Sequence, residues 1–139
     1  MRTVRLSLAA LVTAAALVGV PASSGNAAEP LDGSKPILCA AMQVRECDAS
    51  RCGRRTAEEV NLPPFFVVDI KQKMVGAVDP AGRKAPIDFF ENEKGRLVLH
   101  GGQEGRGWSI VIASDTGKLS ASVVDAEAIF VVTGACILR

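Results

Sequence analysis

The residues that could do chemistry in this chain are few, and a serine with the single histidine forms the only hydrolase-like pair. A serine nucleophile needs a base within hydrogen-bond reach. Ser109, in the segment GWSIV, lacks the second glycine of a G-x-S-x-G elbow and is expected in the middle of a strand. His100 ends the segment RLVLH beside a glycine turn, where an exposed histidine is ordinary. A hydrolase acting through Ser109 and His100 is therefore the minor alternative.

Carboxylates and glycines give no further catalytic pattern. Glu91 and Glu93 flank a turn, and Asp88 and Glu91 fall on opposite strand faces, so no pair is placed across a cleft as glycoside hydrolysis requires. The glycines of residues 101–107 (GGQEGRG) precede a strand, and no Lys-Ser/Thr pair follows them. A hairpin turn is favoured over a phosphate site. We predict no catalytic residue and no cofactor.

The four cysteines are expected to form disulfides, because an even number in a small exported chain is typical of a disulfide framework. Three pairings are possible. We favour Cys39–Cys136, which joins the first strand to the last, with Cys47–Cys52, which closes the polar segment CDASRC. Structural zinc sites use paired short spacings, which this pattern does not match, and the chain has one histidine. We therefore predict no metal site.

Aromatic side chains are the candidates for binding a small apolar ligand. Adjacent phenylalanines place one ring on each face of a strand. Inward rings and the single tryptophan of a closed barrel would then line a pocket; the candidates are Phe66, Phe89, Trp108 and Phe130. The alternative is a filled core, which is the expected outcome for a short chain with little apolar material to spare.

Four arginines are the candidates for binding a protein partner of the cell envelope: Arg51, Arg54, Arg55 and Arg106. They fall in segments expected to be loops, and loops carry much of protein recognition. The alternative is a solvated basic run whose arginines pair with nearby carboxylates.

The N-terminus has the layout of a secretory signal peptide. Arg2 and Arg5 precede the uncharged apolar stretch 6–20, and the small residues up to Ala27 and Ala28 offer two cleavage sites. The apolar stretch is shorter than the roughly 20 residues of a membrane-spanning helix. We predict a signal peptide over 1–28 and a periplasmic or secreted bacterial protein.

After cleavage the chain is nearly neutral, since the first 28 residues contain two of the 16 basic residues and none of the 15 acidic ones. This balance argues against nucleic acid as a partner. No later stretch is long and apolar enough to span a membrane. Residues 29–36 (EPLDGSKP) read as a flexible lead-in, and 37–139 as a single β domain.

Alternating hydrophobicity and glycine turns predict an all-β fold of about eight strands. The expected strands are 37–46, 65–71, 73–78, 87–91, 96–100, 108–112, 118–124 and 128–136. Short connections favour an up-and-down antiparallel β-barrel held by disulfides, with a seven-stranded β-sandwich as the alternative. Thr56 and Glu59 form a capping-box pattern, which supports one short helical turn at most.

The order of several segments resembles a group of small exported bacterial proteins of uncharacterised function: LCAAM, EC, CRR, EEVNLPPFF, GRGWSIVI, TGKLSASV and a late GAC. The resemblance implies a shared fold and an envelope location, and it implies no activity. The strand count is similar in outline to calycin-type barrels. We expect a non-enzymatic barrel that binds a small apolar ligand or an envelope protein; the alternatives are the Ser109/His100 hydrolase and a purely structural envelope protein.

Overall fold

A computed structural model describes residues 29–80 and 82–139, so the predicted signal peptide lies outside the described residues. Nearly all regular structure in this part is β, and the exception is one 3-10 turn, η1 (Glu58–Val60). The strands are β1 (Ile37–Cys47), β2 (Cys52–Arg55), β3 (Phe65–Asp69), β4 (Met74–Ala77), β5 (Lys84–Pro86), β6 (Phe89–Glu93), β7 (Arg96–Gln103), β8 (Arg106–Ala113), β9 (Lys118–Val124) and β10 (Ile129–Leu138).

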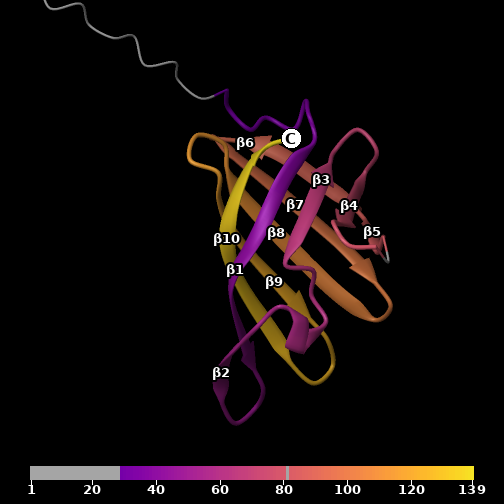
Figure 1. The fold of residues 1–139 in the computed structure, drawn as a ribbon, viewed down its shortest axis with the longest axis vertical. Helices are drawn as coiled ribbons and strands as arrows, with labels where there is room; N and C mark the ends of the chain where they lie inside the picture. The colour runs from indigo at the N-terminus through magenta and orange to yellow at the C-terminus, as the bar shows by residue number, and fades with distance from the viewer. Residues whose placement is uncertain (1–28, 81) are drawn as a thin grey trace, which may run out of the picture.

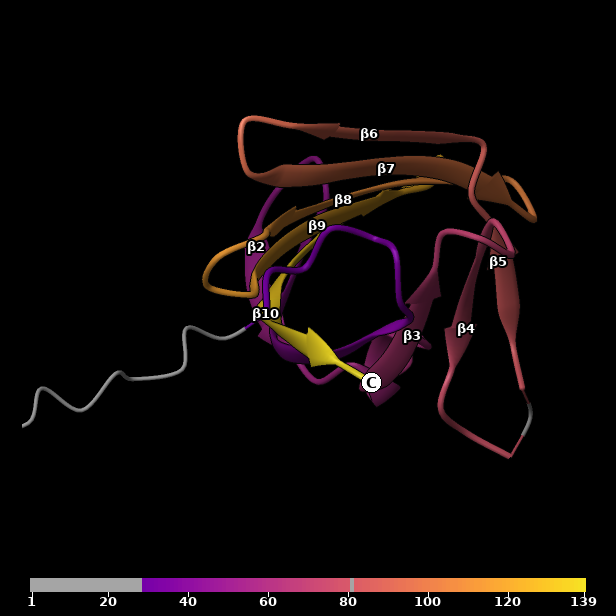
Figure 2. The same ribbon diagram turned by 90° about the horizontal axis from the view of Figure 1, so that it is seen from above.

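The strands form one antiparallel sheet in the order β5-β4-β3-β1-β10-β9-β8-β7-β6, with β2 paired to β1 outside this order. The long strand β1 therefore lies in the middle of the sheet, between β3 and β10 (Figure 1). Seen from above, the sheet curls round until β5 approaches β7 (Figure 2). The result is an antiparallel half-barrel, in which the twist of each strand accumulates into curvature.

The prediction of an all-β, disulfide-linked barrel-like fold is confirmed, with two more strands than expected. The extra strands are β2 and β5, at positions predicted to be loops. Each is short and contains glycine or proline, and each pairs along only one side, with β1 and β4 respectively. Such edge positions tolerate residues that interior strands exclude, because no second row of ladder hydrogen bonds is needed.

Both predicted disulfides, Cys39–Cys136 and Cys47–Cys52, are present. Cys39 and Cys136 are directly opposite each other on β1 and β10 and are buried. In an uninterrupted strand, the even spacing of Cys39 and Cys47 would place both on one face of β1, but the structure does not have this arrangement. A β-bulge at Met42 adds one residue to β1, so the alternation changes phase and Val44 becomes buried.

The capping box is present as predicted at η1. The Glu59 amide donates to Thr56 Oγ1 at 3.2 Å, and the Thr56 amide donates to Glu59 Oε2 at 2.7 Å. Asn61 then ends the turn with φ of 56°. In the described part of the chain, no helix has the length and hydropathy of a membrane span.

One end of the half-barrel is filled by large side chains. Its buried core includes Leu97, Leu99, Ile112 and Leu119, packed beside the Cys39–Cys136 bridge. The lead-in segment crosses this end (Figure 2) and adds Leu31 to the same core. The Leu31 amide donates to the Ser114 carbonyl at 2.9 Å. Residues 29–36 thus cover one end of the half-barrel.

Candidate functional site

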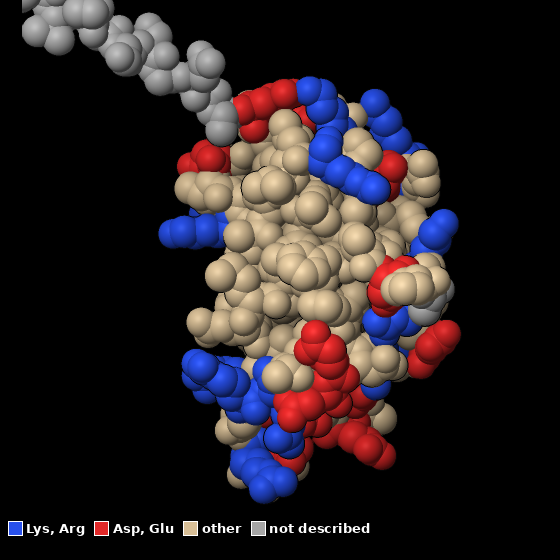
Figure 3. Space-filling model, viewed as in Figure 1, with Lys and Arg blue, Asp and Glu red and all other residues tan. Residues whose placement is uncertain are grey.

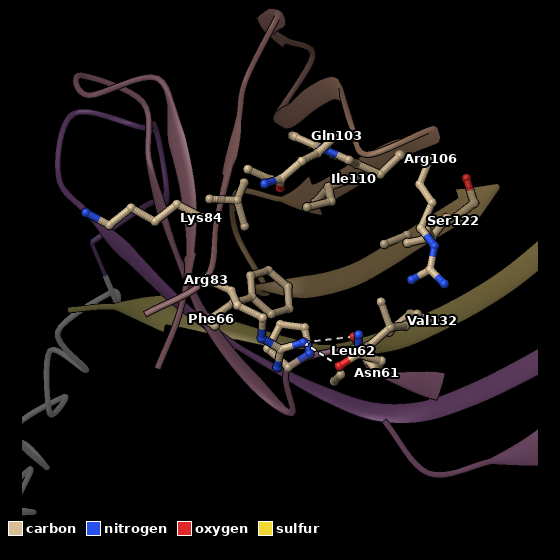
Figure 4. Close-up of a pocket in the computed structure, with 18 of the residues that line it drawn as sticks. Asn61, Leu62, Phe66, Arg83, Lys84, Gln103, Arg106, Ile110, Ser122 and Val132 are labelled. Carbon is tan, nitrogen blue, oxygen red and sulfur yellow. Dashed lines mark hydrogen bonds between the residues drawn. The ribbon is translucent and has the colours of Figure 1, made fainter. Parts of the chain in front are cut away.

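The other end of the half-barrel encloses a cavity of about 420 Å³ (Figure 4). Its inner wall is apolar and comes from strands on both sides of the curl: Phe66, Val75, Ala77, Ala85, Trp108, Ile110, Ala121 and Val132. Polar side chains lie at the mouth, chiefly Asn61, Arg83, Lys84, Gln103, Glu104 and Arg106. An apolar interior with a few polar groups at its opening is the usual construction of a small-molecule site.

Alanines at inward positions leave this space. Ala121 on β9 lies opposite Ile110 on β8 and Val132 on β10, and Ala77 lies opposite Phe66 on β3. At the filled end, the equivalent inward position on β9 is Leu119, which is 2% exposed. One barrel thus has a packed layer and a hollow layer. The expected filled core and the alternative of a pocket are both present, at opposite ends.

Trp108 lies on the wall of the cavity near the seam between β5 and β7. A Cβ atom on Gly101, its partner across the β7–β8 ladder, would overlap both the Trp108 ring and the Pro86 carbonyl oxygen. Only glycine at 101 therefore lets the indole occupy the seam. Its buried Nε1 has no hydrogen-bond partner among residues 29–80 and 82–139. As the chain's single tryptophan, it is a fluorescent reporter of the cavity.

Arg83 connects the two sides of the mouth (Figure 4). Its Nη1 donates to the carbonyl and side-chain oxygens of Asn61, at 3.0 and 2.9 Å, and its Nη2 donates to Asp79 Oδ2 at 2.9 Å. These bonds join the β4–β5 connection to the end of η1, across 22 residues of sequence. The hydrogen-bonding groups of Arg83 are thereby mostly used within the protein.

Arg106 is held differently. It begins β8 after a tight turn in which Glu104 and Gly105 both have positive φ. Its Nε lies 3.5 Å from Asp125 Oδ2, and its guanidinium carbon lies 5.9 Å from the centre of the Phe130 ring. The amides of Glu127 and Ala128 donate to Asp125 and lower the pKa of its carboxyl, with a smaller contribution from Arg106. Asp125 therefore stays charged beside Arg106.

The four aromatic candidates are not brought together in one place. Phe66 and Trp108 both line the cavity. Phe130 is buried beneath Arg106 and lines a second, more polar hollow of about 530 Å³. Phe89 lies at the surface on edge strand β6, with its ring 5.4 Å from that of His100.

The four arginine candidates do not form one cluster, although Arg55 lines one small hollow with Arg51 and another with Arg106. Arg55 donates to Glu46 at 2.7 Å, which raises the pKa of its guanidinium, and Arg51 lies 3.9 Å from Asp48. Arg54 is exposed on β2. Arg106 lies at the cavity mouth and also lines the second hollow, which it shares with Arg55.

Ser109 and His100 lie directly opposite each other on β8 and β7. In the part of the chain that the structure describes, no hydrogen bond joins the two side chains, and the imidazole contacts the Phe89 ring. The described histidine, cysteine and carboxylate side chains form no group of three or more suited to a metal ion.

The middle of the outer face of β1, β3 and β10 has few charged side chains (Figure 3). Charged side chains gather toward the two ends of this view. Met42, Phe65 and Ile137 are exposed there by 71, 52 and 64%.

Sequence reasoning missed most of the mouth. Asn61 and Arg83 were not among the predicted site residues; they lie 22 residues apart in sequence and meet in the folded protein. The inward alanines carried a signal, since Ala121 alternates with Leu119 and Val123 on β9, but their opposite neighbours depend on strand order.

Comparison of the chain with protein-family models, curated proteins and solved structures gives no match. The description of this site therefore depends on its own geometry. The similarity to small exported proteins and to calycin-type barrels stays a prediction.

Proposed function

We propose that this protein is an exported binding module that holds a small apolar ligand in the cavity of its half-barrel. One observation supports the proposal most directly: an apolar space of about 420 Å³ remains at this end of the half-barrel. Alanines occupy inward positions here, whereas large side chains occupy the inward positions at the other end. The volume is within the range of about 300–1,000 Å³ for small-molecule sites. Transfer of apolar ligand surface from water to this wall would supply the binding free energy.

The proposed location is the periplasm or the extracellular space. Two disulfides fit an oxidising environment, and the predicted signal peptide would direct the chain there. In this proposal the barrel acts without catalysis: the strands hold the ligand, and the mouth residues control its access.

The proposal is tested by titrating the disulfide-bonded protein with decanol and with decanoate while recording Trp108 fluorescence. The matched variants are Ala121→Phe, which fills the space between Ile110 and Val132, and Ala135→Phe, which adds the same side chain to the exposed outer face of β10. We expect at least one ligand to change the emission of the wild type and of Ala135→Phe. Binding to Ala121→Phe should be weaker by about tenfold or more, about 1.4 kcal/mol.

Native mass spectrometry of the protein purified from the periplasm gives an independent measure, since a retained ligand adds its own mass. The proposal is wrong if neither ligand changes the Trp108 emission of the wild type. It is also wrong if Ala121→Phe, with unchanged thermal unfolding, binds as tightly as the wild type.

A further inference from the structure

The two arginines at the cavity mouth differ in what their terminal nitrogens do. Arg83 has hydrogen bonds to Asn61 and Asp79 from Nη1 and Nη2. Neither terminal nitrogen of Arg106 makes a hydrogen bond within residues 29–80 and 82–139; in that part of the chain Nε pairs with Asp125 and the guanidinium carbon lies over the Phe130 ring. Arg106 therefore contacts Asp125 and Phe130 while its two terminal nitrogens stay available.

The available end of Arg106 is directed toward the mouth. In Figure 4 its terminal nitrogens extend from the β7–β8 turn into the opening, toward the side of Val132 and Leu62, whereas the end of Lys84 points away from the other labelled side chains. The side chain is 39% exposed, so water reaches it and a ligand can displace that water. A planar guanidinium held this way matches the two oxygens of a carboxylate or phosphate.

Building on the proposed function, we infer that the ligand is an amphipathic acid whose apolar body enters the cavity and whose anionic group binds the terminal nitrogens of Arg106 at the mouth. The apolar wall fits the body, and Arg106 is the cationic group at the mouth whose terminal donors are unused and point into the opening.

Neighbouring carboxylates limit how this site attracts its ligand. Glu104 lies on the same turn and lines the cavity, and Asp125 is paired to Arg106. They offset much of the positive charge of the mouth, so long-range steering is weak. Recognition then depends on the short-range geometry of one guanidinium. Affinity should accordingly depend on the ligand's acid group more than on the net charge of the protein.

The test compares two ligands of equal chain length, decanoate and decanol, at neutral pH, with Trp108 fluorescence as the readout. The wild type should bind decanoate at least about tenfold more tightly, as expected for a charge-assisted contact. Arg106→Gln should reduce decanoate binding by a similar factor and leave decanol binding unchanged. Arg54→Gln, which removes a positive charge on β2 away from the cavity, should change neither.

Arg106→Lys provides a second variant, since it keeps the charge and removes the two-pronged geometry. It should bind decanoate less tightly than the wild type and more tightly than Arg106→Gln, with decanol again unchanged. This variant also keeps the ion pair with Asp125, so the inference stays testable if Arg106→Gln unfolds.

The outcomes separate this inference from the proposal on which it depends. If decanol binds as tightly as decanoate, or if Arg106→Gln binds decanoate like the wild type, the cavity binds ligands but the assignment to acids is wrong. If the wild type binds neither ligand, the proposed function fails, and this inference fails with it.

Discussion

Removal of the Cys39–Cys136 bridge should destabilise the protein far more than removal of Cys47–Cys52. The first bridge spans 97 residues of sequence and the second spans five. In the loop-entropy account, closing a loop restricts the unfolded chain more as the loop grows. The corresponding contributions to the free energy of unfolding are about 4.7 and about 2 kcal/mol.

The expected difference in stability depends on where each bridge lies as well as on the length of the loop that it closes. Cys39 and Cys136 join β1 to β10, the two longest strands, in the middle of the sheet, and both are buried. The Cys47–Cys52 bridge closes only the exposed β1–β2 hairpin. Its loss leaves the ladder from β1 to β10 in place.

Urea unfolding of two double variants, Cys39→Ala/Cys136→Ala and Cys47→Ala/Cys52→Ala, measures this difference. Unfolding is monitored by Trp108 fluorescence, and the linear extrapolation gives the free energy in water. We expect the first variant to lose about 2–3 kcal/mol more than the second. A third variant, Cys39→Ala/Cys136→Val, restores side-chain volume and separates the loss of packing from the loss of the crosslink.

Equal losses in the first two variants would refute the loop-entropy reasoning. If Cys39→Ala/Cys136→Val is as stable as the wild type, then lost packing, and not the lost crosslink, explains the instability of Cys39→Ala/Cys136→Ala.

Two further predictions concern the β-bulge and the CDASRC turn. A Cβ atom on Gly134, opposite Ala41 at the bulge, would contact the Ala40 carbonyl oxygen, so Gly134→Ala should cost about 1–3 kcal/mol in urea unfolding. Gly53→Ala, where the space is open, is its control, and equal losses would contradict this reasoning. Hydrogen bonds from the Ser50 hydroxyl and the Ser50 and Arg51 amides lower the pKa of Asp48 from 3.8 to about 2. The resulting stabilisation should be complete above pH 4 and disappear as the pH falls through 2. A carboxyl NMR titration should show a midpoint near 2 that rises in Ser50→Ala; a wild-type midpoint near 3.8 would contradict the assignment.

The local features of the fold were predictable because they depend on residues close in sequence. Alternation placed Leu119, Ala121 and Val123 on one face of β9, and glycine turns marked the hairpins. The Thr56–Glu59 capping box formed as its spacing predicted. The phase of β1 was not predictable from its spacing, because the bulge at Met42 arises where β1 meets Gly134 and Thr133 of β10.

The site was only partly predictable. Phe66 and Trp108 were named from their alternation, and both line the cavity. Phe89 shared the same pattern but lies on the edge strand β6, where one side of the strand has no neighbour in the sheet order. Composition alone gives no means to tell an edge strand from an interior one.

By itself, the sequence determined most of the strands and the turns, because these depend on alternation and on short spacings. It also indicated that the four cysteines form disulfides, because their number is even and their spacing does not fit a zinc site. Tertiary structure alone decided that one end of the barrel is packed and the other hollow. The reason is geometric: the space beside Ala121 exists only because Ile110 and Val132 flank it in register and Trp108 closes the seam. Likewise, the curl of the sheet brings Asn61, Arg83 and Arg106 to one mouth, although no short-range pattern connects them.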